Sequence, residues 1–129
     1  MKNAIEKIES LEDVVFGNGV SGQSIADAEQ RLNLTFAEDY RAYLKCYGLI
    51  AYDGHELTGL GNSDRTNVVL VTKTERLLRC GISQDMYVLE QMHIDDIVIW
   101  QSSSGIIWQT VGRQEPVRLA SSLLDYLEL

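Results

Sequence analysis

The stretch SGQSIADAEQRLNLTFAEDYRAYLKCYG, residues 21–48, holds two helical patterns that are separated by a short corner. In the first, Ile25, Ala28 and Leu32 recur at the three- and four-residue spacing that places side chains on one face of a helix. This spacing predicts a helix over residues 22–33 whose apolar face is turned towards a core.

The second pattern is rich in tyrosine and ends at a glycine. Its apolar stripe recurs at helical spacing and consists of Tyr40, Tyr43, Leu44 and Tyr47. Gly48 follows, and glycine commonly ends a helix because it adopts a left-handed backbone at little cost. Thr35 and Glu38 match the T-x-x-E pattern of a capping box, which predicts that Thr35 begins this helix. We expect the tyrosine rings to pack in the core with their hydroxyls reaching the surface.

The chain on either side of these helices contains shorter patterns. Residues 2–11 carry apolar side chains at the spacing of a short amphipathic helix, and residues 14–16 are expected to form an extended piece. After the tyrosine-rich helix, Asp53-Gly54 separates two short apolar runs. This dipeptide predicts a two-residue β-hairpin, because a type I′ turn needs positive φ at both positions.

A further helix is expected over residues 72–80. Thr72 and Glu75 form a second T-x-x-E pattern, and Gly81 follows the helix. The preceding residues 68–71 have the sequence VVLV, which is apolar and β-branched. Their propensity favours a strand, so the sequence leaves an extended or a helical conformation open for them.

Three short strand patterns separated by turns predict an antiparallel meander over residues 86–90, 97–101 and 106–110. The segment IVIW, residues 97–100, is apolar on both faces, which is typical of a strand covered on both sides. We expect helices on one face and another element, or a partner, on the other. Residues 117–119 are expected to form a last edge strand. Ser122 and Asp125 indicate the start of a final helix.

Length and composition favour one α+β domain over residues 1–129, with a central antiparallel β-sheet flanked by helices. Cys46 and Cys80 are expected to be free thiols that pack as small hydrophobic residues. No apolar run has the length of a membrane span, and the first residues lack the pattern of a signal peptide. We therefore expect a cytoplasmic protein that does not associate with membranes.

The formal net charge is −8, and the sequence pI is about 4.6. Nucleic-acid binding needs basic surface to replace the counterions around phosphates, so this charge argues against it. It argues equally against anionic membranes. A basic protein partner is compatible with it, and the alternative is that the acidic residues serve solubility alone.

The charge is also unevenly distributed. Residues 80–112 contain no Lys or Arg, although they hold both tryptophans of the chain. The acidic residues of this segment are Asp85, Glu90, Asp95 and Asp96, and its large aromatic residues are Tyr87, Trp100 and Trp108. Carboxylates with aromatic anchors suit an interface for a cationic protein. The alternative is that the tryptophans belong to the core of a sheet with polar turns.

Two groups of histidine and carboxylate residues are the candidates for metal chemistry. They are Asp53, His55 and Glu56, and His93, Asp95 and Asp96. Their spacing matches no helical ligand pair, and both groups fall in expected turns, where these residue types are common. Residues 102–104, SSS, lack the G-x-S-x-G pattern of a nucleophilic serine. We predict no catalytic residue, no metal and no cofactor, with a metal-dependent enzyme using His55 and His93 as the less favoured alternative.

Several short motifs occur in an order that is typical of one family. I-x-x-A-E-x-x-L at residues 25–32 precedes E-D-Y-x-x-Y-L-x-x-Y-G at residues 38–48, and the chain closes with S-L-L-D-Y-L at residues 122–127. Between them lie further matching positions, which are Gly54, Gly59, Thr72, Ser104 and Gly105. This order resembles the SMI1/KNR4 family, also called the SUKH superfamily. Phe36-Ala37 departs from the Leu-Pro that usually stands at its corner.

The resemblance implies an α+β fold with a central antiparallel sheet and a role in protein binding. Bacterial members are typically immunity proteins of polymorphic or contact-dependent toxin systems, which bind and block a cognate toxin that is often a nuclease. Eukaryotic relatives act as interaction hubs. We therefore expect an immunity protein that neutralises a toxin with a basic surface, and a regulatory adaptor for an endogenous protein is the alternative.

The expected binding surface combines charge with aromatic anchors. The residues expected to steer the partner are Asp85, Glu90, Asp95 and Asp96. The residues expected to anchor it, on the condition that their rings are exposed, are Tyr52, Trp100 and Trp108.

Overall fold

The computed structural model describes residues 3–61 and 63–129. Its helices are α1 (Ala4–Ser10), α2 (Gly22–Leu32), α3 (Glu38–Cys46), α4 (Val68–Leu78), α5 (Leu123–Leu127) and the short 3-10 helix η1 (Asp64–Thr66). Its strands are β1 (Val15–Phe16), β2 (Ile50–Tyr52), β3 (His55–Glu56), β4 (Met86–Gln91), β5 (Ile97–Ser102), β6 (Ile107–Val111) and β7 (Val117–Ala120). The structure is therefore α+β, as the sequence predicts, and none of the helices in its described part is long and apolar enough to cross a membrane.

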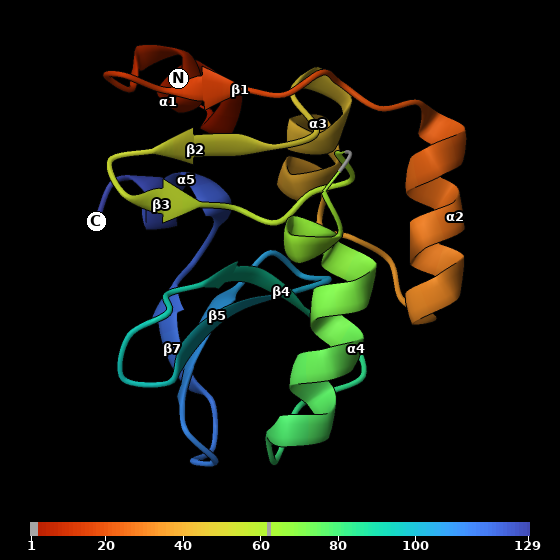
Figure 1. Ribbon diagram of the computed structural model, residues 1–129, viewed down its shortest axis with the longest axis vertical. Coiled ribbons are helices and arrows are strands. Elements are labelled where there is room, and N and C mark those ends of the chain that lie inside the picture. Colours follow the sequence, from red (N-terminus) through yellow and green to blue (C-terminus); the bar gives the residue numbers. More distant parts are fainter. Residues whose placement is uncertain (1–2, 62) are drawn as a thin grey trace.

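The strands form two antiparallel sheets instead of one. The meander β4-β5-β6-β7 is the larger sheet, and β1-β2-β3 is a second, three-stranded sheet beside it (Figure 1). The β2–β3 hairpin turns at Asp53 and Gly54, which have φ values of 45° and 79°. Positive φ at both positions is what the Asp-Gly dipeptide predicts for a two-residue turn.

The two sheets are joined at an irregular point of β4. Its register with β5 shifts between Val88 and Glu90, so a bulge lies there. Leu57, directly after β3, forms an isolated antiparallel bridge with Glu90, and the Thr58 backbone N–H donates to the Leu89 carbonyl at 2.8 Å. The bulge thus lets the end of the hairpin pair with the edge of the larger sheet.

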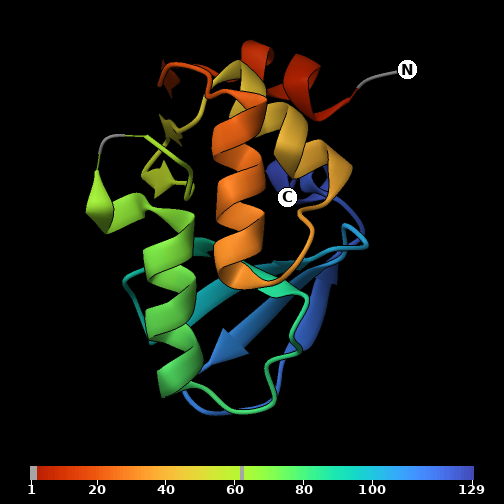
Figure 2. The same cartoon turned by 90° about the vertical axis from the view of Figure 1, so that its right-hand side faces the viewer.

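Helices cover both faces of the larger sheet. Side chains alternate along β5, so Val98 and Trp100 face α4, where they pack in one cluster with Val71. Ile99 faces the opposite way and belongs to the main core, which includes Leu44 of α3 and residues of α5. Figure 2 shows α2 and α4 side by side in front of the sheet. Both faces of the IVIW segment are therefore covered by other parts of the same chain.

Tyr40 and Tyr43 form a buried polar junction, so the expectation that their hydroxyls reach the surface is wrong for these two. It holds for Tyr47, whose hydroxyl donates to Glu9 at 3.2 Å at the surface. Tyr40 and Tyr43 are 0% exposed. The Tyr40 hydroxyl lies 2.9 Å from Thr58 Oγ1, and the Tyr43 hydroxyl donates to the Thr58 carbonyl at 2.9 Å. Thr58 Oγ1 in turn donates to the Val88 carbonyl at 2.7 Å, and the Ile50 N–H donates to the Tyr43 hydroxyl at 3.2 Å. These bonds tie α3 to both sheets at once.

The helix starts differ from both T-x-x-E predictions. Ala37, at the N-cap of α3, makes no side-chain capping bond, and its N–H donates to the Tyr87 hydroxyl at 3.0 Å. At α4, Asn67 Oδ1 accepts from the N–H groups of Val69 and Leu70 at 3.0 and 3.2 Å. The helix therefore begins before Thr72, whose hydroxyl accepts from the Val88 N–H at 2.9 Å.

The cysteines are free thiols, as expected, but they do not pack as buried hydrophobic residues. Cys46 lies at the end of α3 and Cys80 beyond the end of α4, and both are exposed free thiols. The last turn of a helix can face solvent even where the preceding turns are buried, so their helical context gave no guide to burial.

The capping assignment predicts unequal effects of two substitutions. Asn67→Ala removes the acceptor for two N–H groups at the start of α4, so the free energy of unfolding should fall by about 0.5–2 kcal/mol. Thr35→Ala is the matched control, because Thr35 is exposed and does not cap α3. Urea unfolding measures both changes, and a larger loss for Thr35→Ala than for Asn67→Ala would contradict the assignment.

Candidate functional site

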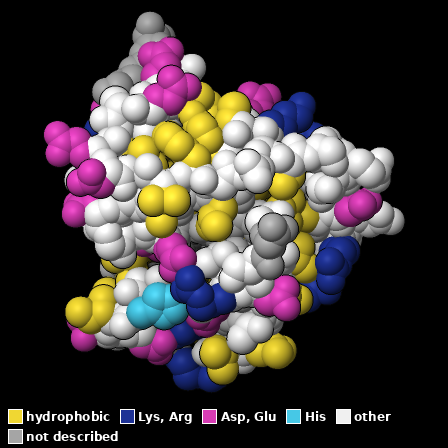
Figure 3. All heavy atoms as spheres, turned by 45° about the horizontal axis from the view of Figure 1, so that its top comes forward, with side chains coloured by type: hydrophobic (Ala, Val, Ile, Leu, Met, Phe, Trp, Pro, Cys, Tyr) yellow, Lys and Arg dark blue, Asp and Glu magenta, His cyan; other side chains and the backbone are white. Residues whose placement is uncertain are grey.

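Acidic side chains gather along one side of the molecule. The β2–β3 turn, the β4–β5 turn and the C-terminus lie along the left side of Figure 1, and α2 lies at the right. The space-filling view shows Asp and Glu side chains along the same left margin (Figure 3). We define the acidic margin by its exposed carboxylates in three separate loops, which are Glu12, Asp13, Asp53 and Asp95.

The backbone of these loops is unusual at three of the four positions. Asp13, Asp53 and Asp95 have φ values of 54°, 45° and 53°, in the left-handed region. Aspartate adopts this region more readily than most residues, because its short polar side chain can hydrogen-bond locally. The turns thus carry exposed carboxylates at these positions.

A pocket of about 590 Å³ opens inside the acidic margin, between the two sheets and α5. Its apolar lining consists of Leu11, Met92, Ile97, Ile99, Leu119, Leu127 and Leu129, together with the rings of Tyr52 and Tyr126. Its polar lining consists of Glu12, Asp13, Asp53, His55 and Gln109. We call this hollow the intersheet pocket. Its size falls in the range of about 300–1,000 Å³ that is usual for binding sites.

A buried carboxylate holds the wall of the intersheet pocket in place. Glu90 is only 2% exposed. It accepts hydrogen bonds from His55 Nδ1 at 2.9 Å, from the Glu56 N–H at 3.3 Å and from the Tyr126 hydroxyl. The ring of Tyr52 stacks on His55, with the ring centroids 5.0 Å apart. Glu90 of β4 thus fixes side chains of β3 and α5, which both border the pocket.

Burial also raises the pKa of Tyr52 to about 12, and the nearby charges of Glu90 and Asp53 act in the same direction. Tyr52 therefore stays a neutral phenol at physiological pH. Its ring lies half-buried between the pocket and the solvent, where it can serve as an aromatic contact.

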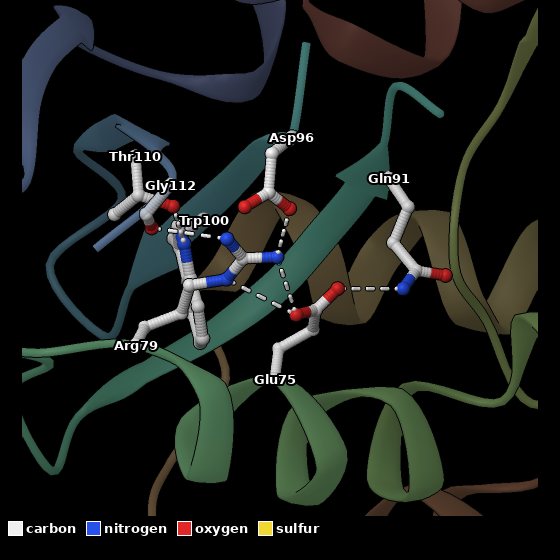
Figure 4. A network of polar contacts seen from close by, with 7 residues as sticks. All are labelled: Glu75, Arg79, Gln91, Asp96, Trp100, Thr110 and Gly112. Carbon is white, nitrogen blue, oxygen red and sulfur yellow. Dashed lines mark hydrogen bonds and ion pairs between the residues drawn. The ribbon is translucent and has the colours of Figure 1, made fainter. Parts of the chain in front are cut away.

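A second buried charged side chain, that of Arg79, holds the β4–β5 turn in place. The Arg79 side chain is 5% exposed and donates to Glu75 at 2.9 Å, to Asp96 at 2.7 Å and to the Gly112 carbonyl at 2.9 Å (Figure 4). Gln91 donates to the other Glu75 oxygen at 2.7 Å. The hydrogen bond from Arg79 lowers the pKa of Asp96. Asp95 and Asp96 are both exposed, but Asp96 is ion-paired with Arg79 and anchors the turn, so we do not count it in the acidic margin.

Two of the predicted site residues are buried, so the expectation that they contribute to an exposed surface is wrong. Trp100 is 0% exposed and donates from Nε1 to Thr110 Oγ1 at 3.0 Å. Glu90 lies beneath the pocket wall and is already hydrogen-bonded. Apolarity on both faces of β5 and the bulge in β4 turn these two side chains inward.

The remaining predicted residues lie in three different places. Tyr52 and Asp95 belong to or border the acidic margin, and Asp96 is tied to Arg79. Trp108 is half-buried against the Trp100 cluster, and its Nε1 has no hydrogen-bond partner among the described residues. Asp85 is half-buried at the start of β4, the opposite end of that strand, where Ser83 donates to it at 2.7 Å.

Sequence reasoning missed Glu12, Asp13 and Tyr126. The two acids follow α1, and only the non-local pairing of β1 with β2 brings them to the hairpin turn. Tyr126 belongs to the apolar side of α5, and no local sequence pattern indicates that its hydroxyl donates to Glu90. Within residues 3–61 and 63–129, no three His, Cys, Asp or Glu side chains are placed to hold a metal ion.

The two tryptophans should differ in their contribution to stability. Trp100→Phe leaves a cavity and removes the hydrogen bond to Thr110, so the free energy of unfolding should fall by roughly 1–3 kcal/mol. Trp108→Phe is the matched control, since it removes a donor without a described acceptor, and we expect a change within about 1 kcal/mol. Urea unfolding measures both. Equal losses of stability from the two substitutions would contradict the assignment of Trp100 as the buried tryptophan and Trp108 as the half-buried one.

The tyrosines predict a loss of stability at alkaline pH. Their ordinary pKa is 10.0, but burial raises the pKa of Tyr52 to about 12 and those of Tyr40 and Tyr126 still further. Between the ordinary pKa of the unfolded chain and the raised pKa of the native chain, the unfolded chain loses protons that the native chain keeps. The free energy of unfolding therefore falls as pH rises above about 10. In a titration with base, tyrosinate absorbance from these residues should therefore appear only above the ordinary pKa of tyrosine, together with unfolding. Reversible ionisation of all tyrosines near pH 10 in the folded protein would refute this expectation.

Comparison with known proteins agrees with this architecture. A search of the curated proteins finds no match. A protein-family model, SUKH_5, described as SMI1-KNR4 cell-wall, matches residues 1–128. Helices packed around antiparallel sheets are consistent with a domain of this type. The chain therefore belongs to the SMI1-KNR4 family of the SUKH group.

Proposed function

We propose that this chain is an immunity protein that binds a cognate toxin and blocks it by covering a basic surface. The observation that carries the proposal is the acidic margin beside the intersheet pocket. Glu12, Asp13 and Asp53 line this pocket, and its described lining contains no Lys or Arg. Membership of a family that acts through protein–protein interaction supports it. In this proposal residues 1–129 act as one domain in the cytoplasm, where the toxin is neutralised.

The acidic margin suits a toxin that acts on nucleic acid. Such an enzyme carries a basic cleft, since it must attract phosphates. Asp13, Asp53 and Asp95 are exposed carboxylates from separate loops, so together they present negative charge over an area instead of at one point. Complementary charge steers the encounter of two proteins and raises the association rate. Tyr52 is the aromatic contact at the centre of this surface.

A catalytic role is not part of the proposal, because the family is generally non-enzymatic. His55 and His93 lie on β3 and in the β4–β5 turn, and the carboxylate that His55 contacts is the buried Glu90. A regulatory adaptor would use the same acidic surface on an endogenous basic protein. The identity of the partner distinguishes these two functions.

Affinity capture from native lysate, followed by mass spectrometry, tests the proposal. We expect one stoichiometric partner that ends in a basic, nuclease-like domain, and the purified chain should abolish the activity of that domain at an equimolar ratio. A stoichiometric housekeeping protein instead would overturn immunity in favour of the adaptor. A captured toxin whose activity is unchanged by the chain would overturn neutralisation.

Removing the exposed carboxylates should slow association with the captured partner. The triple variant Asp13→Asn, Asp53→Asn, Asp95→Asn keeps side-chain shape and removes three charges, so we expect about a tenfold lower association rate at low salt and a flatter salt dependence. Asp27→Asn on α2 is the control, because this exposed carboxylate lies on the opposite side of the molecule. Surface plasmon resonance at several salt concentrations measures both, and equal effects would refute steering by the acidic margin.

A further inference from the structure

The intersheet pocket combines apolar walls with a charged rim. Met92, Ile99 and Leu119 are among the side chains of its walls, and the carboxylates of Asp13 and Asp53 stand at its rim. We infer that this pocket seats one arginine side chain of the partner protein. The inference rests on the proposed function, because it names the group by which the basic partner is anchored.

The charge around the pocket selects a cation. Asp13 and Asp53 line both the intersheet pocket and a neighbouring, shallower hollow of about 370 Å³, so they lie on the ridge that separates the two. Glu12 adds a third carboxylate on the intersheet side. The described lining holds no Lys or Arg to neutralise these charges. A cation that enters from solvent therefore meets carboxylates from two separate loops.

The walls select a cation with an apolar stem. Long basic side chains bury their methylene groups against apolar surface while the charged head stays near polar groups. Met92 and Leu119 are half-buried, so part of their apolar surface remains open in the pocket lining. An isolated metal ion or a small ammonium ion would leave this apolar wall without a contact.

The aromatic and amide groups of the lining favour arginine over lysine. The Tyr52 ring is held by stacking on His55, which Glu90 fixes from behind at 2.9 Å. A planar guanidinium stacks on aromatic faces and donates to several acceptors in a fixed fork, whereas an ammonium is a compact, strongly hydrated charge. Gln109 of β6 adds an amide oxygen to the lining as a further type of acceptor.

An uncharged apolar side chain is the competing occupant. It would use the same walls, but it would gain nothing from Asp13 and Asp53 at the rim. The two occupants therefore differ in one measurable property, which is the dependence of binding on those two carboxylates. A pair of probes that differ only in charge separates them.

The test is a titration of the full chain by nuclear magnetic resonance with N-acetyl-arginine amide. N-acetyl-citrulline amide is the matched probe, because citrulline has nearly the shape of arginine without its charge. We expect the arginine probe to shift the methyl resonances of Met92 and Leu119 with a dissociation constant on the order of 10 mM, and the citrulline probe to bind at least about fivefold more weakly. Equal shifts from both probes, or no shift of these methyl groups, would overturn the arginine site.

Two variants assign the effect to the rim. Asp13→Asn with Asp53→Asn should weaken binding of the arginine probe at least about fivefold, while Asp27→Asn on α2 should leave it unchanged. Unchanged amide spectra away from the pocket show that both variants are folded. Equal weakening by Asp27→Asn would overturn the site, because it would indicate attraction by net charge alone.

The titration needs no partner, so its failure is separate from failure of the proposed function. A captured toxin together with a negative titration would overturn the arginine site alone. A positive titration together with a housekeeping partner would support a cation site on this face and overturn immunity.

Discussion

The Thr58 side chain and backbone hold the structure together at the point where its layers meet. Thr58 accepts from the Tyr43 hydroxyl through its carbonyl, contacts the Tyr40 hydroxyl, and donates to the Val88 carbonyl. Each of these groups is buried, where an unpaired polar atom would cost about 1–3 kcal/mol. Helix, hairpin and larger sheet therefore fix one another, and none of the three satisfies its polar groups alone.

Glu90 extends the same constraint to the intersheet pocket. A carboxylate this deeply buried is tolerated because several donors surround it, and those donors come from β3 and α5. The positions of His55 and Tyr126 are thus set by a group that is itself buried. The pocket wall is preorganised, which lowers the entropy that binding would otherwise lose.

Local sequence patterns predicted the helices and strands well, whereas contacts between distant parts of the chain decided helix capping and the burial of particular side chains. The spacing around Ile25 and Tyr40, the Asp53-Gly54 turn and the meander all occur in the structure. The two capping predictions were wrong because Tyr87 and Thr72 make long-range bonds at those points, and the motif describes only the local sequence. The two-sided apolar pattern of residues 97–100 already favoured the core position of Trp100, whereas burial of Glu90 depended on the β4 bulge, which no spacing reveals. The acidic margin likewise forms only because β1 pairs with β2, which lies far from it in the sequence.

The left-handed backbone at Asp13, Asp53 and Asp95 limits how this surface can evolve. Glycine, asparagine and aspartate are the residues that such positions accept readily. Exchange between aspartate and asparagine changes the charge at each turn while the backbone stays the same. Substitutions can therefore change the charge of this surface in single steps, at sites that lie outside the Thr58 junction, so that the charge of the surface is uncoupled from the fold.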